Sequence, residues 1–281
     1  MKNSVVLSLL AFFLLQYSST CFSETLTLGV HPYKSVSKLQ QYYLPLTKYL
    51  SKKLNADVQL NIAKDYKTHI DLIGNDEIDI AYMGPASYVD MVKQYGNKRL
   101  LVRQVINGKP TFKGQIFTRS DLDINSLSQL KNKKFAFGDA ASTMSHLVPR
   151  YMLINSGVNK DNLAEMSFLG SHDNVAIAVL SGAFDAGAVK EAVFYKYEDR
   201  GLKSLSETPE LSEHLYVVSN KVSEENVERI KNIMMEMKND AEGMKVLKGI
   251  KKTITEMGSV SDKDYDNLRE ILGLLTEKGI L

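Results

Sequence analysis

The sequence contains no tryptophan and only one cysteine, Cys21, among its 281 residues. A single cysteine cannot form a disulfide within the chain, so covalent cross-links are excluded as a source of stability. Low-complexity tracts are also absent, which excludes a disordered chain. The 44% share of hydrophobic residues and the chain length instead predict one or two folded domains held by core packing.

Neither sign of charge dominates. The chain has 35 basic and 33 acidic side chains, a formal net charge of +2, and no long basic block. A nucleic-acid-binding domain usually shows a strong basic patch, so we expect no nucleic-acid partner. The one local basic run, residues 248–252, falls in a predicted helix, and we interpret it as a solvated helix face.

Beyond the start of the chain there is no run of 18 apolar residues, which excludes a lasting membrane span. The apolar run Val5–Leu15 follows Lys2 and precedes small and polar residues, in the order of a secretory signal peptide. We therefore expect a signal peptide over residues 1–23 and a mature chain outside the cytoplasm. Lipid attachment at Cys21 is the alternative, but residues 18–20 before it match a lipoprotein box poorly.

Signatures of catalysis are also missing. The sequence has no Gly-x-x-x-x-Gly-Lys-Ser/Thr, His-Glu-x-x-His or Gly-x-Ser-x-Gly motif, and its histidines do not form a metal-ligand spacing. Ser142 and His172 could form a catalytic pair, but two donors to one anion explain them more simply. We expect no enzyme activity, no cofactor and no metal.

What the chain does have is a regular alternation of strand-like and helix-like segments, followed from Ser223 by an almost entirely helical region. The predicted strands are 26–30, 58–62, 78–83, 100–106, 115–118, 134–137, 165–169, 186–189 and 215–219, and the main helices before Ser223 are 39–54, 66–73, 86–95, 142–156 and 174–181. Such alternation predicts an α/β fold with mainly parallel sheets flanked by helices. We expect two lobes, residues 24–112 with 207–281 and residues 113–206, with a ligand cleft between them.

The most informative segment is residues 138–149, where small residues lead from a strand into a helix that begins with two hydroxyls, Ser142 and Thr143. The first amides of a helix have no internal acceptor and carry a partial positive charge, so an anion can be bound there by hydrogen bonds alone. The alternative is that Ser142 simply caps the helix.

This segment resembles the Ser-Thr-Ser-Gly-x-x-x-Pro signature of periplasmic phosphate-, phosphite- and phosphonate-binding proteins of ABC importers. Further stretches fall in that family's order and approximate spacing, so the resemblance covers nearly the whole mature chain. They are Asp65-Tyr66, residues 79–85, residues 170–174 and residues 185–191. The resemblance implies a two-lobed type II periplasmic binding protein fold and a small oxyanion ligand.

By this resemblance, Ser142, Thr143 and His172 bind the oxyanion from one lobe, and Tyr66 binds it from the other. A lone histidine or tyrosine is otherwise more often structural. Met144 stands where the family has its second serine, so the hydroxyl of Ser145 is a further candidate.

Three other positions remain open. Met83 stands at a second aromatic position of the family, so either Tyr82 or Met83 is a candidate contact. Glu191 fits an acidic position that can accept a ligand's amino group or acidic proton; the alternative is a surface carboxylate. The family has a second acidic position, in an Asp-Pro pair. Glu213-His214 lies at about that place in this sequence but lacks the Asp-Pro pair, so the residue that matches is unclear. We therefore favour a simple phosphorus oxyanion or a small phosphonate over an aminoalkylphosphonate.

The resemblance implies a periplasmic, monomeric solute-binding protein whose partner is an ABC permease in the membrane. The alternative is a soluble module that reports the bound anion to a membrane sensor kinase, because the same lobes serve that purpose too.

Overall fold

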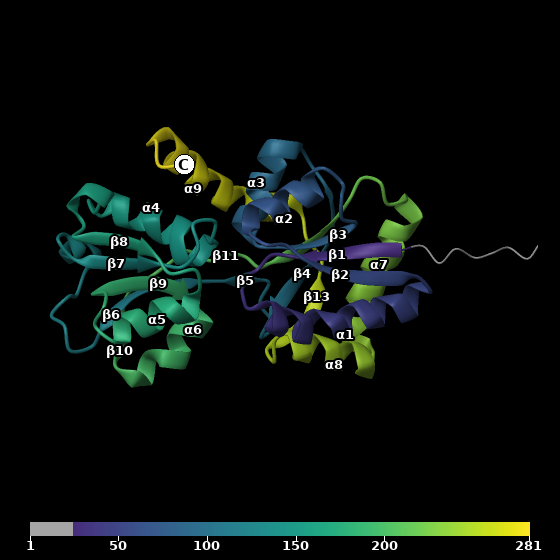
Figure 1. Ribbon diagram of the computed structural model, residues 1–281, viewed down its shortest axis with the longest axis horizontal. Helices are drawn as coiled ribbons and strands as arrows, with labels where there is room; N and C mark the ends of the chain where they lie inside the picture. Colours follow the sequence, from purple (N-terminus) through teal and green to yellow (C-terminus); the bar gives the residue numbers. More distant parts are fainter. Residues whose placement is uncertain (1–24) are drawn as a thin grey trace, which may run out of the picture.

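The computed structural model describes residues 25–281, so the predicted signal peptide and Cys21 lie outside the described residues. Two sheets lie side by side along the long axis of the molecule, each with helices on both faces (Figure 1). We call the parts built on them the first and the second lobe. The α/β class predicted from the sequence is confirmed.

The first lobe has the strand order β13-β4-β12-β3-β1-β2. Its strands are β1 (Thr25–Val30), β2 (Asp57–Ile62), β3 (Ile80–Met83), β4 (Arg99–Ile106), β12 (Leu215–Val218) and β13 (Ile254–Gly258). One face packs on α1 (Val36–Leu54), α7 (Glu224–Glu236) and α8 (Ala241–Ile250), and the other on α2 (Tyr66–Gly74), α3 (Pro85–Tyr95) and α9 (Asp266–Glu277). Two hydrophobic cores result, one on each side of the sheet.

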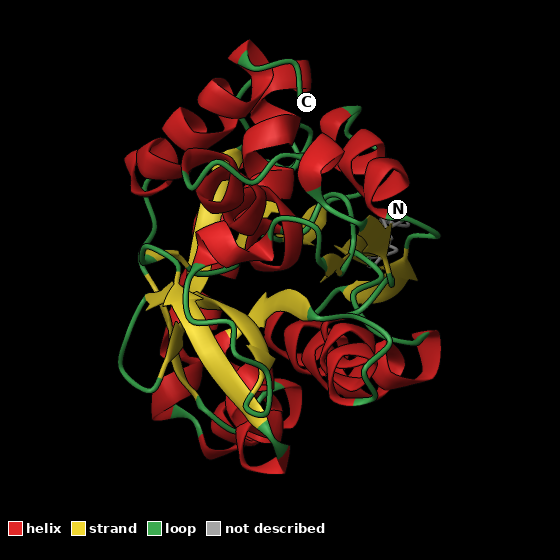
Figure 2. Ribbon diagram, turned by 90° about the vertical axis from the view of Figure 1, so that its left-hand side faces the viewer, coloured by secondary structure: helices red, strands yellow, loops and turns green. Residues whose placement is uncertain are grey.

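The second lobe has the strand order β10-β6-β9-β7-β8. Its strands are β6 (Gly114–Arg119), β7 (Lys134–Phe137), β8 (Glu165–Phe168), β9 (Ala186–Lys190) and β10 (Leu202–Glu207). Helices α5 (His172–Leu180) and α6 (Glu191–Tyr197) pack on one face and α4 (Val148–Asn155) on the other. Figure 2 shows the sheets and their covering helices from the side.

The chain passes between the lobes twice, and the two passages pair as an antiparallel ribbon of β5 (Thr111–Phe112) and β11 (Leu211–Ser212). A second connection is made by α9, which contacts both α3 of the first lobe and α4 of the second (Figure 1). Met144, Leu147 and Val148 share a core cluster with Leu268 and Leu275 of α9. The two lobes are therefore joined on one side by buried apolar side chains.

The prediction of mainly parallel sheets was wrong, because both sheets are mixed. β1 is parallel to β2 and β3, and β7 is parallel to β8 and β9, but the remaining pairs are antiparallel. Parallel pairing requires a long crossover, usually a helix. Strands β4, β6, β10 and β12 adjoin the direct passages between the lobes, where no crossover helix sets their direction.

The expectation of a C-terminal region that is almost entirely helical was also wrong. The five residues of β13 lie between α8 and α9 and form an edge of the first sheet. Only Ile254 and Met257 of this strand are buried, so its pattern lacks the strict alternation that marks a strand in sequence.

Gly187 tests the packing of the second lobe. A Cβ at this position of β9 would lie 2.6 Å from Val175 Cγ1 and 3.1 Å from Ala136 O. Gly187→Ala should therefore lower the free energy of unfolding in urea by about 1–3 kcal/mol. The matched control is Gly273→Ala in α9, where an added Cβ meets nothing within 4 Å. It should raise stability by about 0.5–1 kcal/mol, because glycine is costly inside a helix. Equal effects of the two changes would contradict this packing.

Candidate functional site

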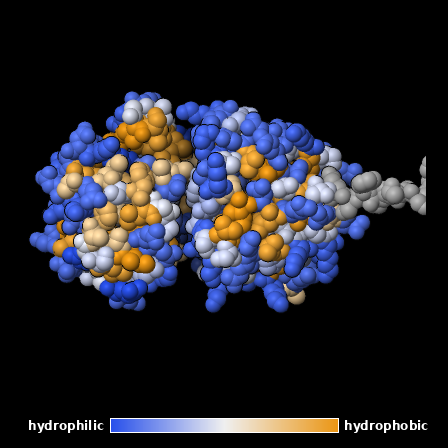
Figure 3. Space-filling model, viewed as in Figure 1, coloured by the Kyte–Doolittle hydropathy of each residue, from blue (hydrophilic) through white to orange (hydrophobic). Residues whose placement is uncertain are grey.

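A cavity of about 570 Å³ is lined by residues of both lobes. Figure 3 shows the groove that separates the two halves of the molecular surface. In the second lobe its lining comes from the loops that follow β7 and β8 and from the end of β9. In the first lobe it comes mainly from the ends of β1 and β3, the start of α2 and the segment around His214. Ligands of α/β sheets commonly bind at such strand ends.

The second-lobe wall contains the start of the predicted helix. Residues 143–147 form a π-helical turn that continues into α4, with Ser142 as N-cap. The Ser142 hydroxyl accepts a hydrogen bond from the Ser145 amide at 3.2 Å, so Ser142 caps the helix and also lines the cavity. The Thr143 and Met144 amides are the first two of the helix and have no acceptor within it.

Thr143 lies where the two lobes meet. Its Oγ1 accepts a hydrogen bond from the amide of Ala86, in the first turn of α3, at 3.1 Å. Ser142 and Thr143 each use an oxygen lone pair in this way, so each hydroxyl proton remains available to a ligand. Two helix starts thus bring their positive ends to the same part of the cavity.

His172 stands beside these hydroxyls. It begins α5, two residues before the predicted start, and its Nδ1 accepts a hydrogen bond from the Lys190 amide at 3.0 Å. An amide can only donate, so the ring proton must be on Nε2, which lies 3.5 Å from Ser142 Oγ. Burial, with the nearby Lys190, lowers the pKa of His172 to about 3. The ring is therefore a neutral donor directed at Ser142.

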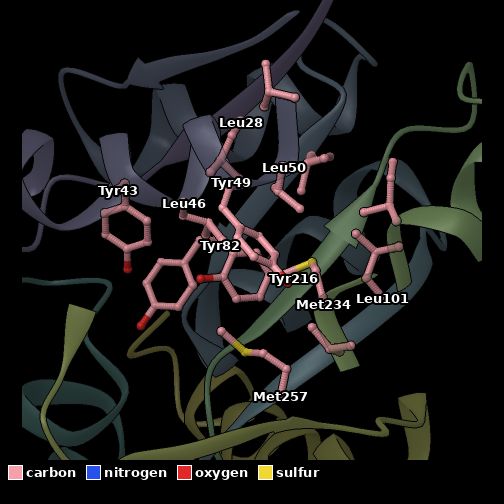
Figure 4. Close-up of a cluster of buried hydrophobic side chains, with 14 of the residues drawn as sticks. Leu28, Tyr43, Leu46, Tyr49, Leu50, Tyr82, Leu101, Tyr216, Met234 and Met257 are labelled. Carbon is pink, nitrogen blue, oxygen red and sulfur yellow. The ribbon is translucent and has the colours of Figure 1, made fainter. Parts of the chain in front are cut away.

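Tyr66 and Tyr82 line the first-lobe side of the cavity. The sequence predicts Tyr66 as a contact and leaves the choice between Tyr82 and Met83 open. Tyr66 begins α2 after its N-cap Asp65, and its ring lies 4.7 Å from that of His31. Burial raises the pKa of Tyr66 far above its ordinary value, so the phenol keeps its proton and can donate it. Figure 4 shows Tyr82 beside Tyr43 and Tyr216 at the edge of the first-lobe core.

A cluster of charged residues lies at the end of the cavity that is near the ribbon of β5 and β11. The buried Glu213 carboxylate accepts hydrogen bonds from the His214 amide at 2.9 Å and from His214 Nδ1 at 2.7 Å, and lies 3.9 Å from Lys190 Nζ. Burial alone would raise the pKa of Glu213, but Lys190 and His214 outweigh it and hold the pKa below its ordinary value. Burial lowers the pKa of Lys190 to about 8, so Lys190 is mostly protonated at neutral pH.

Three predicted contacts are not among the residues that line the cavity. Ser145 is fully buried, and its hydroxyl donates to the Ala188 carbonyl at 2.5 Å. Met83 packs in the core on the opposite face of the sheet from Tyr82, because neighbouring side chains of a strand alternate. Glu191 lies half-buried at the start of α6, whereas its neighbour Lys190 reaches the cavity.

Other lining residues were missed. His31 follows the first predicted strand, a position that the strand-end rule could have indicated. The sequence leaves open whether His214 contacts the ligand, and His214 lines the cavity; Lys190 lies in the stretch 185–191, in which only Glu191 was singled out. The basic run interpreted as a solvated helix face also lines the cavity, through Lys248, Lys251 and Lys252.

The part of the chain from residue 25 onward holds no group of three or more His, Cys, Asp or Glu side chains that could bind a metal. Over the same residues, no helix is both long and apolar enough to cross a bilayer.

A family profile described as "ABC transporter, phosphonate, periplasmic substrate-binding protein" matches residues 28–265. The chain belongs to this family. The phosphate-import protein PhnD of Mycolicibacterium smegmatis is 30% identical over 277 residues, which cover 89% of this chain and 85% of that protein. A probable phosphite-binding protein, PhnD1, of Prochlorococcus marinus is 30% identical over 188 residues, 63% of each chain.

Among solved structures, that of Prochlorococcus marinus PhnD1 in complex with methylphosphonate has a TM-score of 0.81 at 24% identity, covering 92% of this chain and all of that one. The aliphatic sulphonate-binding protein SsuA of Escherichia coli has a TM-score of 0.61 at 13% identity, covering 92% and 88%. The predicted type II periplasmic binding protein fold is confirmed. Family membership makes the chain an ABC-transporter substrate-binding protein, which implies a small-molecule ligand and a permease partner.

The histidines, of which His31, His172 and His214 line the cavity, give a test of the burial described above. Burial is the main cause that lowers the pKa of all five, to about 4 for His69, His146 and His214, to about 3 for His172, and well below 6.5 for His31. The histidines of the folded protein therefore stay neutral at pH 5.5, whereas those of the unfolded chain bind protons. Stability should fall as the pH drops from about 6.5 towards 4, by about 1 kcal/mol per histidine per pH unit.

Urea unfolding at pH 7.5 and 5.5, with an NMR titration of the imidazoles, measures this effect. A histidine of the folded protein that titrates near pH 6.5 would contradict the burial described above.

Proposed function

We propose that this chain is the extracytoplasmic solute-binding protein of an ABC importer, and that it binds a phosphorus oxyanion in the cavity between its lobes and delivers it to the permease. The ligand is phosphate, phosphite or a small phosphonate. The lobes comprise residues 24–112 with 207–281 and residues 113–206, and export to the periplasm uses residues 1–23 as a cleaved signal peptide.

The observation that supports this ligand class is the set of neutral donors on one wall: the hydroxyls of Ser142 and Thr143 and Nε2–H of His172. A tetrahedral oxyanion needs several donors around its oxygens, and its burial is costly unless these oxygens are hydrogen-bonded. The unpaired amides of Thr143 and Met144 at a helix start add to them.

The relatives point to the same chemistry. One is named for phosphate import and another for phosphite binding, and the solved structure of the second protein contains methylphosphonate. We carry over from them only the shared part of these ligands, a phosphorus atom with anionic oxygens.

Delivery follows from closure of the lobes. The ligand bridges the second-lobe donors to Tyr66 on the first lobe, with Tyr82 beside it, and so stabilises the closed arrangement. The ribbon of β5 and β11 acts as the hinge. Lys34 of the first lobe and Asp173 of the second, whose charged atoms lie 3.4 Å apart, add a contact between the lobes.

Ser142→Ala tests the donor wall. The change removes a helix cap and a ligand donor, so we expect a loss of about 1 kcal/mol in stability and at least about a tenfold loss in affinity for methylphosphonate by calorimetry. The matched control is Ser223→Ala, because Ser223 caps α7 by the same type of bond, from the Asn226 amide, and does not line the cavity. It should lose similar stability but no affinity. Full affinity in Ser142→Ala would refute the assignment.

Tyr66→Phe tests the first-lobe contact. Loss of one phenolic donor to an anion should weaken methylphosphonate binding by about tenfold and leave unfolding nearly unchanged. Tyr195→Phe, at a residue that is 54% exposed on α6, is the control and should bind as the wild type does. If the two variants bind equally well, Tyr66 does not contact the ligand.

A further inference from the structure

Carboxylates are scarce in the cavity, and the one that lines it is already paired. Among the described residues, Asp173 is the only acidic one in the lining, and it accepts hydrogen bonds from Lys196 at 2.6 Å and Tyr197 at 2.9 Å and lies 3.4 Å from Lys34. Glu213 lies behind the lining and is only 1% exposed. Among the described residues of the lining, no unpaired carboxylate is therefore left for a ligand.

Lys190 places its ammonium group next to the Glu213 carboxylate, on the side that faces the cavity. Its Nζ lies 3.9 Å from Glu213 Oε2 and 4.6 Å from the ring centroid of Phe112 in the hinge strand β5. Lys190 belongs to the second lobe and Glu213 to the segment between β11 and β12, so this ammonium group reaches across the cavity.

The remaining charges of the lining have the same sign as Lys190. Lys34, Lys248, Lys251 and Lys252 also line the cavity, and Lys251 is half-buried. A ligand with an ammonium group would therefore meet like charge without a free carboxylate, which is costly away from bulk water.

We propose that Lys190 is a specificity-determining residue: its ammonium group takes the place beside Glu213 where an amino group of a ligand would be held. The site then excludes aminoalkylphosphonates and admits phosphorus oxyanions whose substituent is neutral or anionic. This inference rests on the proposed function, because it concerns the substituent of that same ligand.

The test uses two ligands of similar size, ethylphosphonate and aminomethylphosphonate, which differ in a methyl and an ammonium group. By calorimetry at pH 7, the wild type should bind ethylphosphonate at least about tenfold more tightly. In Lys190→Met the side-chain volume remains while the charge is lost, and Glu213 loses the ammonium group beside it while it keeps its hydrogen bonds from His214. The ratio should therefore fall to within about threefold or invert.

Two control variants separate charge from other effects. Lys190→Arg keeps the charge and should keep the wild-type ratio. Lys160→Met removes an exposed lysine of the same lobe that does not line the cavity, and should also keep it. If Lys190→Met does not fold, Lys190→Gln removes the charge but keeps a polar side chain beside Glu213, and its ratio should likewise fall to within about threefold.

The outcomes distinguish the two proposals. Equal binding of the two ligands by the wild type, binding of neither by any variant, or an unchanged ratio in Lys190→Met overturns the role of Lys190 and leaves the proposed function standing. A wild type that binds none of methylphosphonate, phosphate and phosphite overturns the proposed function, and the inference with it.

Discussion

The hydrogen bond from the Lys190 amide to Nδ1 of His172 is the constraint on which the proposed binding wall depends. It fixes the ring proton on Nε2 and directs that proton towards Ser142. Burial keeps the ring uncharged, so His172 offers a donor without bringing a proton that titrates near neutral pH. The same residue whose backbone sets this donor sends its side chain to Glu213. One strand end, that of β9, thus shapes both the wall that we propose for the oxyanion and the charge beside it.

The fold makes this arrangement possible because it brings strand ends and helix starts from both lobes to one cavity. The π-helical turn at residues 143–147 places two hydroxyls in the second-lobe wall, and the Ala86 amide of α3 meets Thr143 from the first lobe. Donors that are neutral and held by backbone atoms need little rearrangement when an anion enters. Selectivity then depends on single groups, because each oxygen of a buried anion requires its own partner.

Sequence reasoning predicted residues that line the second-lobe side of the cavity because their signal is local. Small residues before a helix with two leading hydroxyls can be seen in one stretch of chain, and Ser142, Thr143 and His172 of the second lobe line the cavity, as Tyr66 of the first lobe does. Lys190 was missed by one position, because at a junction of strand and helix the register of side chains depends on where the helix begins. His214 and His31 stack 6.1 Å apart although 183 positions separate them in the chain, and only the strand order brings such residues together. The edge strand β13 was missed because only two of its five residues are buried, and these two do not alternate.

The most direct test is a crystal structure of the protein with methylphosphonate. The phosphonate oxygens should lie within hydrogen-bond distance of Ser142 Oγ, Thr143 and His172 Nε2, with the Lys190 amide still donating to His172 Nδ1. A phosphonate bound instead at the lysines of residues 248–252, with no oxygen near Ser142 or His172, would contradict the binding wall described here.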